Sequence, residues 1–460
     1  MKTYVYAQHL SHAHFYLSLF ESFETQNKVT IFTDNISLFL TIKFQKRFKY
    51  IFHTVHLIPP FYNKKKNQQE RDLDERESKV LNYVIQYFGK APQKAKSQYL
   101  NNIEWISNRI EKESLGLCWS GNKSEALAFS QAITKSKGTV YFGEITNYPQ
   151  TIYFDKKGTN YYSSIRSNFE NQLKNNDSES QIDDKYKKIL LSLKTNQKKI
   201  PQSNQKNVTK IYYFISGIQN YLFRNGSRFH LFKTLKTNFK LTFEKEKYIS
   251  QLIDRGEWLD LNNFSIPECN GPKYKVLIPL QIYSDTQLHV FSKYKSPVDF
   301  IQNIVKLIDS NIYIDFKLHP AEKNKYNKLT VLVLDKLASK FPQIRLVDTF
   351  EKDKYDIIAT INSTFGIDAL LSGIKVISFG ESLYSGFNFL LEYSDKYKDL
   401  REAIDCYDKS VKSENFNLFA KIIYENFYHF NYFGVGNIKA NTDPEKFQES
   451  LDKLKPIFQL

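Results

Sequence analysis

Residues 357–380 (IIATINSTFGIDALLSGIKVISFG) constrain most strongly what this chain can fold into. The segment opens with an apolar run, passes through a polar turn, continues as a short amphipathic pattern that stops at Gly373, and ends in a β-rich run. This order predicts a strand, a turn, a helix, a glycine cap and a second strand. In a parallel sheet such a unit presents the first N–H groups of its helix at the carboxyl ends of the strands, where α/β proteins bind ligands.

The turn contains two hydroxyl side chains, Ser363 and Thr364, directly before the predicted helix. Hydroxyls beside unbonded N–H groups suit a phosphate. Ser and Thr are also the usual helix N-caps, so phosphate binding and plain capping explain these two residues equally well.

A second polar strand end lies upstream, where the predicted strand 312–320 ends in His319-Pro320. The proline requires a turn, so the imidazole emerges at the carboxyl end of a strand. A single histidine is more often structural than catalytic. Two polar strand ends from neighbouring units face the same crevice, however, and this pairing favours a ligand site.

Two carboxylates occupy comparable places. Glu144 follows predicted strand 139–143, and Asp285 lies just past predicted strand 274–281. A carboxylate at the carboxyl end of a strand is a candidate acid, base or metal ligand. For Glu144 taken alone, an ordinary surface glutamate is the more frequent explanation.

The predicted elements alternate between strand and helix along most of the chain, which indicates α/β architecture with parallel sheets. In the N-terminal part, predicted strands 3–7, 28–33 and 50–57 alternate with helical patterns. A polar stretch from 168 to 210 connects this part to the next. We predict domains at 1–270 and 271–440, followed by a closing amphipathic helix at 441–460 that packs back on a domain.

Composition indicates a globular protein, because 41% of the 460 residues are hydrophobic. Three widely spaced cysteines, Cys118, Cys269 and Cys406, form neither a disulfide framework nor a metal site, which suits a reducing compartment. We expect no signal peptide at the start of the chain, and the sequence has no membrane-spanning apolar window. We therefore expect a cytoplasmic protein, with peripheral binding at the inner membrane as an open alternative.

The formal net charge is +16, with the lysines spread along the chain. No nucleic-acid-binding signature accompanies them, so we expect no nucleic-acid partner. An anionic substrate or a membrane surface is the better interpretation of the charge. A lysine-rich composition with solvated charges explains it equally well.

Several segments, in this order, resemble the bacterial capsule and lipopolysaccharide β-Kdo transferases and their capsule-synthesis relatives over residues 116–388. The segments are Glu144, Phe154-Asp155-Lys156-Lys157-Gly158-Thr159-Asn160-Tyr161-Tyr162, Leu280-Gln281 with Asp285, Lys317-Leu318-His319-Pro320, Asn362-Ser363-Thr364-Phe365-Gly366 through Gly373, and Tyr384-Ser385-Gly386. The resemblance implies a GT-B type glycosyltransferase, in which two Rossmann-like α/β domains face across a cleft. The departures are Glu144-Ile145-Thr146-Asn147, where many relatives continue with Asp-Gly and then Arg, and Leu318 in place of a proline.

The resemblance also implies a CMP-activated donor of Kdo or a related acidic sugar, and a glycan or glycolipid acceptor. His319, Ser363 and Thr364 would hold the donor phosphate, with Lys317, Asn362 and Gly366 in the same donor-binding segments. Asp285 would attack the anomeric carbon in a retaining transfer, and Glu144 would be the second carboxylate. We expect no cofactor and no metal, since no Asp-x-Asp pair lies at a strand end.

Two alternatives stay open. The same scaffold can use another nucleotide sugar or a phosphate-activated pentose, with Glu144 as the base of an inverting reaction. Alternatively, the chain is a non-catalytic capsule-assembly protein that binds an acidic polymer through its basic surface.

Overall fold

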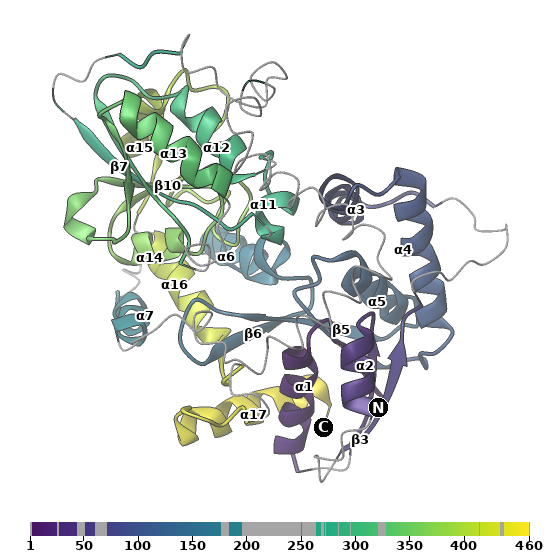
Figure 1. Ribbon diagram of the computed structural model, residues 1–460. Helices are drawn as coiled ribbons and strands as arrows, with labels where there is room; N and C mark the ends of the chain where they lie inside the picture. The colour runs from purple at the N-terminus through teal and green to yellow at the C-terminus, as the bar shows by residue number, and fades with distance from the viewer. Residues whose placement is uncertain are drawn as a thin grey trace. The chain divides into compact units, whose positions relative to one another are not determined.

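The structure is a computed structural model of the chain, and its described residues form two compact α/β units (Figure 1). The described residues are 2–24, 27–43, 51–59, 71–175, 184–195, 250, 264–267, 271, 273–283, 285–294, 296–320, 328–413, 415–432 and 437–459. Cys269 lies outside the described residues. Of the residues next to the predicted border at 270, only Gly271 is described.

The two units are discontinuous in sequence. Within the described residues, the first unit comprises residues up to Asn168, residues 193–195 and residues 422–459, and the second comprises Phe169–Ser192 and the described residues between 250 and 421. The segment after 421 rejoins the first unit because strand β13 (Tyr428–His429) pairs with β6 (Thr151–Asp155). The limits at 1–270, 271–440 and 441–460 stay a prediction, and the border at 440 falls inside this returning segment.

The first unit is built on a seven-stranded sheet of order β13-β6-β5-β4-β1-β2-β3. The five strands from β5 to β3 in this order are mutually parallel, whereas β6 and β13 are antiparallel to their neighbours. The parallel strands are β1 (Thr3–Tyr6), β2 (Asn27–Thr33), β3 (Ile51–Leu57), β4 (Leu115–Trp119) and β5 (Thr139–Ile145). Strands alternate with helices along the chain, as the sequence predicts.

The helices of the first unit begin at recognisable local signals. Helix α3 (Glu75–Phe88) starts with a capping box between Asp74 and Glu77 and ends at Gly89, which has a left-handed backbone. Helix α4 starts at Pro92, because proline fits the first turn of a helix. The other helices of this group are α1 (Leu10–Ser22), α2 (Ile36–Lys43), α4 (Pro92–Ser107) and α5 (Ser124–Lys135).

The predicted Asp-Lys-Lys-Gly turn follows β6 and is held by a single carboxylate. Asp155 accepts hydrogen bonds from the backbone N–H groups of Lys157 and Gly158 at 2.7 and 3.1 Å. Its second oxygen accepts from the Ser163 hydroxyl and the Ser164 N–H, both at 2.7 Å. This turn leads through the short helix Asn160–Tyr162 into α6 (Ser164–Asn175).

The second unit contains a six-stranded, fully parallel sheet of order β12-β11-β10-β7-β8-β9. In chain order these strands follow the doubly wound Rossmann arrangement, so the winding direction reverses between β7 and β10. The strands are β7 (Tyr274–Pro279), β8 (Ile312–Lys317), β9 (Ile344–Val347), β10 (Ile357–Thr360), β11 (Lys375–Ser378) and β12 (Leu391–Glu392).

Helices α12, α13 and α15 are drawn beside β7 and β10 in Figure 1 and bury their apolar faces in the same core as the sheet. Helix α12 starts at Pro297 behind the Ser296 cap and ends at Val305. The helices of the second unit are α11 (Thr286–Val290), α12 (Pro297–Val305), α13 (Lys328–Lys340), α14 (Phe365–Leu371), α15 (Leu400–Ser410) and, at its sequence borders, α6, α7 (Lys185–Thr195) and α16 (Asn415–Glu425).

The closing helix is confirmed as α17 (Pro444–Phe458), which packs back on the first unit. Its side chains Phe447, Leu451, Leu454 and Phe458 are each no more than 5% exposed and belong to the core of that unit. The ring of Phe458 contacts those of Phe20, Tyr141 and Phe154.

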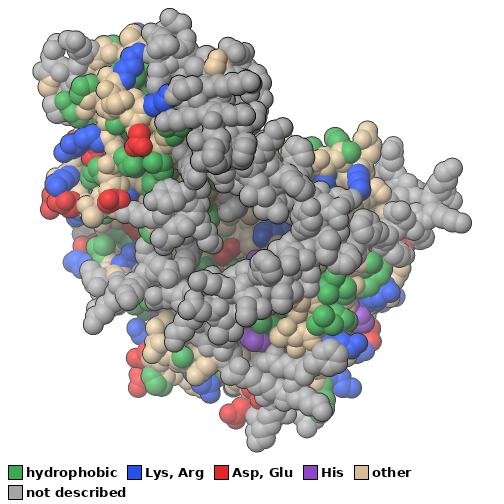
Figure 2. All heavy atoms as spheres, viewed as in Figure 1, with side chains coloured by type: hydrophobic (Ala, Val, Ile, Leu, Met, Phe, Trp, Pro, Cys, Tyr) green, Lys and Arg blue, Asp and Glu red, His purple; other side chains and the backbone are tan. Residues whose placement is uncertain are grey.

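Over the part of the chain that the structure describes, no helix is both long enough and apolar enough to cross a membrane. On the face drawn in Figure 2, basic and acidic side chains are interspersed over the described surface.

Candidate functional site

The candidate donor site lies where the second sheet reverses its winding. The loops that follow β7 and β10 leave the same edge of the sheet from adjacent strands. Gln281 from the first loop donates through Nε2 to Oδ1 of Asn362 in the second loop, at 2.7 Å. Both side chains are buried. The structure therefore joins the two predicted loops through a direct side-chain hydrogen bond.

Asp285 lies in the same hydrogen-bonded group. It is the N-cap of the short helix α11, which the sequence analysis did not predict, and its Oδ1 accepts from the Gln287 N–H at 2.9 Å. Its Oδ2 accepts from Gln281 Nε2 at 3.3 Å. Burial raises the pKa of the Asp285 carboxyl, and the two hydrogen bonds oppose that rise. Gln281 thus connects Asp285 to Asn362.

The Asn362 side chain holds the two loops together. While Oδ1 accepts from Gln281, Nδ2 donates to the carbonyl of Gln287 at 2.9 Å. An amide that is bonded at both ends fixes the position of its neighbours. Asn362 thereby helps to fix the position of Ser363 and Thr364, which follow it. Direct contact between Asn362 and a sugar donor stays a prediction.

Ser363 and Thr364 lie between β10 and α14, as predicted. The Ser363 hydroxyl accepts from the Phe365 N–H at 3.2 Å. Thr364 is the N-cap residue of α14 by position, but its side chain makes no capping hydrogen bond and the residue is exposed. Plain N-capping therefore does not explain Thr364.

Gly366 makes room for a tyrosine from another motif. A Cβ added at Gly366 would lie 2.4 Å from Oη of Tyr384, so a larger side chain requires that ring to move. The Tyr384 hydroxyl donates to the carbonyl of Ser363 at 2.5 Å. Tyr384 thus packs against the turn that contains Ser363 and Thr364. Gly366 leaves the space for the Tyr384 ring, and this packing role adds to its predicted place in the donor site.

His319 and Lys317 come from the strand next to β7. Strand β8 ends at Lys317, whose carbonyl accepts from the Leu280 N–H at 2.8 Å, and His319 follows two residues later. Burial, followed by the charge of Lys317, lowers the pKa of the His319 imidazole. A histidine with a lowered pKa is neutral near neutral pH and offers a hydrogen bond in place of a fixed charge.

Glu144 belongs to the first unit and lies inside β5, whereas the sequence predicted it just beyond the strand. The strand continues to Ile145 because β6 pairs with it, with Glu144 opposite Tyr153. The side chain is half-buried. Burial and the charge of Glu144 raise the pKa of Tyr153. Its predicted catalytic role stays a prediction.

Sequence reasoning did not identify Gln281 or Tyr384 as parts of the site framework. Both lie in segments that carry the family resemblance, but their partners are distant in sequence, 81 residues for Gln281 and 21 for Tyr384. The only sequence signal for Gln281 and Tyr384 was their place in segments that resemble the family. The described residues include no group of three or more His, Cys, Asp or Glu that could hold a metal ion.

A family model described as "Capsule polysaccharide biosynthesis protein" matches residues 129–390, which is more than half of the 460-residue chain. The match coincides closely with residues 116–388, over which the sequence motifs show their resemblance. It includes Glu144, Asp285, His319 and residues 362–366. A search of curated proteins found no match.

Among solved structures, the chain is similar to "Thermosulfurimonas dismutans KpsC, beta Kdo 2,7 transferase", with 12% identity, a TM-score of 0.44, and coverage of 99% of this chain and 100% of that one. A beta Kdo 2,4 transferase KpsC from the same organism matches with 14% identity, coverage of 74% and 87%, and a TM-score of 0.34. An alpha,alpha-trehalose-phosphate synthase (UDP-forming) from Burkholderia vietnamiensis matches with 8% identity, coverage of 98% and 100%, and a TM-score of 0.35. These scores are too low to transfer a substrate or a mechanism.

The identity of the chain rests instead on the family match, together with the motif order and the sheet that carries those motifs. The motifs after β7, β8 and β10 leave one edge of a single doubly wound sheet, and the family model spans all of them. The family resemblance seen in the sequence is thereby confirmed. This chain belongs to the capsule polysaccharide biosynthesis protein family.

Proposed function

We propose that this protein is a glycosyltransferase of bacterial surface polysaccharide biosynthesis that transfers Kdo or a related acidic sugar from a CMP-activated donor. The observation that carries the proposal is the hydrogen-bonded group of Gln281, Asp285 and Asn362 at the point where the second sheet reverses. Nucleotide ligands of doubly wound sheets bind in this crevice, outside the carboxyl ends of the strands. The family match supports the link to capsule synthesis.

The donor phosphate would be bound by His319, Ser363 and Thr364, with Lys317 nearby. These residues follow β8 and β10, the strands on either side of β7. A neutral imidazole, two hydroxyls and an ammonium group supply hydrogen bonds and positive charge to a leaving phosphate without requiring a metal ion.

In the proposed reaction an Asp285 oxygen attacks the anomeric carbon, and the bond from that carbon to the phosphate oxygen breaks, so that CMP leaves with the electron pair. The acceptor hydroxyl then attacks the same carbon and releases Asp285, while Glu144 takes the hydroxyl proton. Two successive inversions give retention. The acceptor is a glycan or glycolipid at the inner membrane face, a location that the net charge of +16 suits.

The first prediction concerns the nucleotide. CMP should raise the melting temperature of the full chain more than UMP, GDP or ADP do, because a ligand that binds only the folded state stabilises it, by about 2.7 kcal/mol at 100 times its Kd. His319→Ala should lose the CMP shift. The matched control is His289→Ala, whose imidazole bonds the Tyr283 carbonyl in the same unit.

A shift that is larger with another nucleotide would remove the CMP assignment and favour a different donor. If no nucleotide shifts the melting temperature, a phosphate-activated donor or a non-catalytic assembly protein becomes the better explanation.

The second prediction concerns Asp285. Asp285→Asn should reduce sugar transfer by at least about a thousandfold, since the amide cannot act as the nucleophile. The fold should persist, because Asn replaces Asp well as an N-cap and can still accept from the Gln287 N–H. Asp399→Asn, at the N-cap of α15 in the same unit, is the matched control.

Mass spectrometry of intact protein tests the covalent step. A Glu144→Gln variant incubated with donor should accumulate a glycosyl adduct that the double variant with Asp285→Asn does not form. Full transfer by Asp285→Asn, or a product of inverted configuration, would exclude the retaining mechanism.

A further inference from the structure

In the sheet of the first unit the winding direction of the strands also reverses at one point, and the proposed donor site does not lie there. Strands β1 and β4 are adjacent and parallel, and the chain leaves them for β2 on one side and β5 on the other. The loops that follow them, 7–9 and 120–123, therefore leave the same edge of the sheet. In doubly wound sheets this is a ligand-binding position.

A lysine bridges these two loops. Lys123 donates through Nζ to Oε1 of Gln8 at 2.7 Å, although the two residues are 115 positions apart. An ammonium group has three donors, and this bond uses one. Among the described residues no carboxylate lies within ion-pair distance of Lys123.

Two helices begin beside this lysine, and neither has a side-chain cap. His9 is the N-cap of α1 and Lys123 is the N-cap of α5, and both side chains make no capping hydrogen bond. The first turn of α1 contains no acidic residue, whereas the first turn of α5 contains Glu125. The first N–H groups of a helix carry partial positive charge, so two such starts and a lysine at one sheet edge favour an anion.

Buried polar atoms in the same loops lack protein partners. Nδ1 of His12, a side chain only 6% exposed, and Oδ1 of Asn122, a side chain that is fully buried, have no hydrogen-bond partner among the described residues. The His12 ring lies 5.1 Å from the His9 ring and stacks on Trp119 at the end of β4. Buried polar atoms are normally bonded, which suggests that a bound polar group completes this site.

The electrostatics of Lys123 agree with this geometry. Burial lowers the pKa of its ammonium group, while the charges of Glu125 and Glu144 oppose that effect only in part. A bound anion would supply the remaining compensation. Glu144 follows Gly143, which pairs with Trp119 at the end of β4, so the proposed proton acceptor lies near this edge of the sheet.

We propose that the edge formed by Gln8, His9, His12 and Lys123 binds an anionic group, a carboxylate or a phosphate, of the acceptor. The assignment to the acceptor rests on the proposed function, in which the second unit binds the donor. An acceptor held by its anionic group at Lys123 would carry its reacting hydroxyl toward Glu144. Lys123 then selects acidic or phosphorylated acceptors over neutral ones.

Calorimetric titration of the full chain tests the proposal with glucuronate as the carboxylate probe, glycerol 1-phosphate as the phosphate probe and methyl glucoside as the neutral probe. Saturating CMP is present throughout to occupy the donor site. At least one anion should bind, methyl glucoside should not, and Lys123→Gln should weaken anion binding by about tenfold or more. The stronger anion identifies the chemical source of the group.

Lys340→Gln is the matched control, because Lys340 also donates a hydrogen bond from Nζ, to the Phe264 carbonyl at 2.8 Å, and belongs to the second unit. Its anion affinity should equal that of the unaltered chain. Equal affinities for the Lys123→Gln and Lys340→Gln variants, or binding of neither anion, would overturn the proposal. If CMP itself fails to bind, the donor assignment fails, whereas the titrations with anions still decide whether the Lys123 edge binds them.

A second variant separates binding from folding. Gln8→Glu places a carboxylate against Lys123 without changing the size of the side chain, so it should keep or raise the melting temperature while it weakens anion binding. A purely structural role of the Gln8–Lys123 bond predicts no loss of anion affinity in this variant, and that result would contradict the proposal.

Discussion

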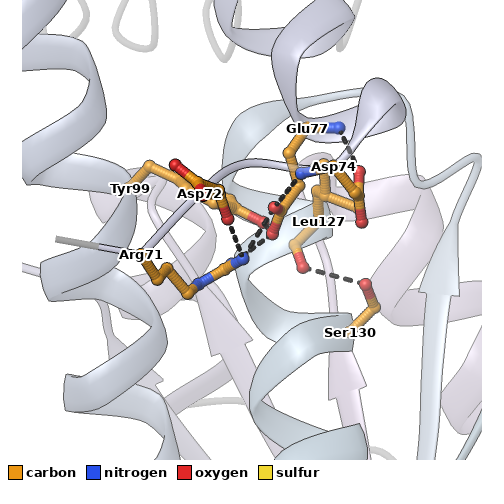
Figure 3. Close-up of polar contacts among 7 residues, drawn as sticks. All are labelled: Arg71, Asp72, Asp74, Glu77, Tyr99, Leu127 and Ser130. Atoms are coloured by element: carbon orange, nitrogen blue, oxygen red, sulfur yellow. Dashed lines mark hydrogen bonds and ion pairs between the residues drawn. The ribbon is translucent and has the colours of Figure 1, made fainter. Parts of the chain in front are cut away.

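Glu77 in α3 is a fully buried carboxylate that neighbouring donors keep ionised (Figure 3). It accepts hydrogen bonds from the Tyr99 hydroxyl at 2.6 Å, from the Arg71 guanidinium and from the Asp74 N–H at 3.0 Å. Burial alone would raise the pKa of this carboxyl, but the hydrogen bonds from Arg71, Tyr99 and Asp74 outweigh burial and lower it. The folded structure therefore favours the ionised form of the Glu77 carboxyl.

We predict that Glu77→Gln lowers the free energy of unfolding by about 1–3 kcal/mol near neutral pH, since it weakens charged hydrogen bonds inside the protein. A carboxyl whose pKa is lowered by folding stabilises the protein above its unfolded-state pKa. This contribution is lost as the pH falls through the folded-state pKa. The difference between the variant and the unaltered chain should therefore shrink on acidification.

Urea unfolding at a series of pH values measures this difference. Glu75→Gln, at an exposed carboxylate paired with Lys79 on the same helix, should change the free energy by less than about 0.5 kcal/mol. A penalty for Glu77→Gln that stays constant down to acidic pH would show that the charge of Glu77 is not its cause.

At the scale of single elements, one arginine of α3 positions the loop that precedes Lys123. The Arg76 guanidinium lies between the rings of Phe142 and Tyr162, 4.8 and 5.0 Å from their centroids. It donates to the carbonyl of Gly121 at 3.0 Å and to that of Lys157 at 2.8 Å. Gly121 has a φ of 71°, which suits glycine, and a Cβ there would lie 2.4 Å from the Phe142 ring. Helix α3 thus fixes one side of the proposed anion site.

The closing helix α17 completes the core of the first unit, and Leu454 is its best test. This side chain is fully buried, so Leu454→Ala should lower the free energy of unfolding by about 2–5 kcal/mol through lost burial and a residual cavity. Chemical denaturation followed by circular dichroism measures the change. The neighbouring, half-exposed Lys453→Ala is the control and should cost less than about 0.5 kcal/mol. Equal effects would mean that α17 does not pack as described.

At the scale of the whole molecule, each unit has a doubly wound sheet, fully parallel in the second unit and parallel from β5 to β3 in the first, in which the strand order reverses at one point. In the second unit that point lies between β7 and β10, and in the first between β1 and β4. One carries the group of Asp285 and Asn362, and the other carries Lys123. This division gives each unit one ligand in the proposed transfer, the donor for the second and the acceptor for the first.

The formal charge of +16 does not identify either ligand by itself. Basic and acidic side chains are interspersed over the described surface in Figure 2. In the proposed function, specificity would therefore come from individual residues in defined positions, such as Lys123 and His319, and the overall charge would add only a general attraction for anions.

The sequence by itself determined the fold class and many of the elements. The segment 357–380 forms β10, α14 and β11 as predicted, and Gly373 adopts a φ of 74°. These features follow from apolar periodicity and turn residues, which act over a few neighbouring positions. The same local signals predicted the strand before His319 and the helix α17.

Only the tertiary structure decided which of these segments meet. The Gln281–Asn362 and Gln8–Lys123 bonds join residues 81 and 115 positions apart, and the two-residue strand β13 returns to the first sheet. No local sequence pattern encodes such pairings. They depend on the position of each strand in the sheet and on the apolar surface that the whole sheet buries. The strand ends that carry the site could thus be predicted from the sequence, whereas their partners required the assembled fold.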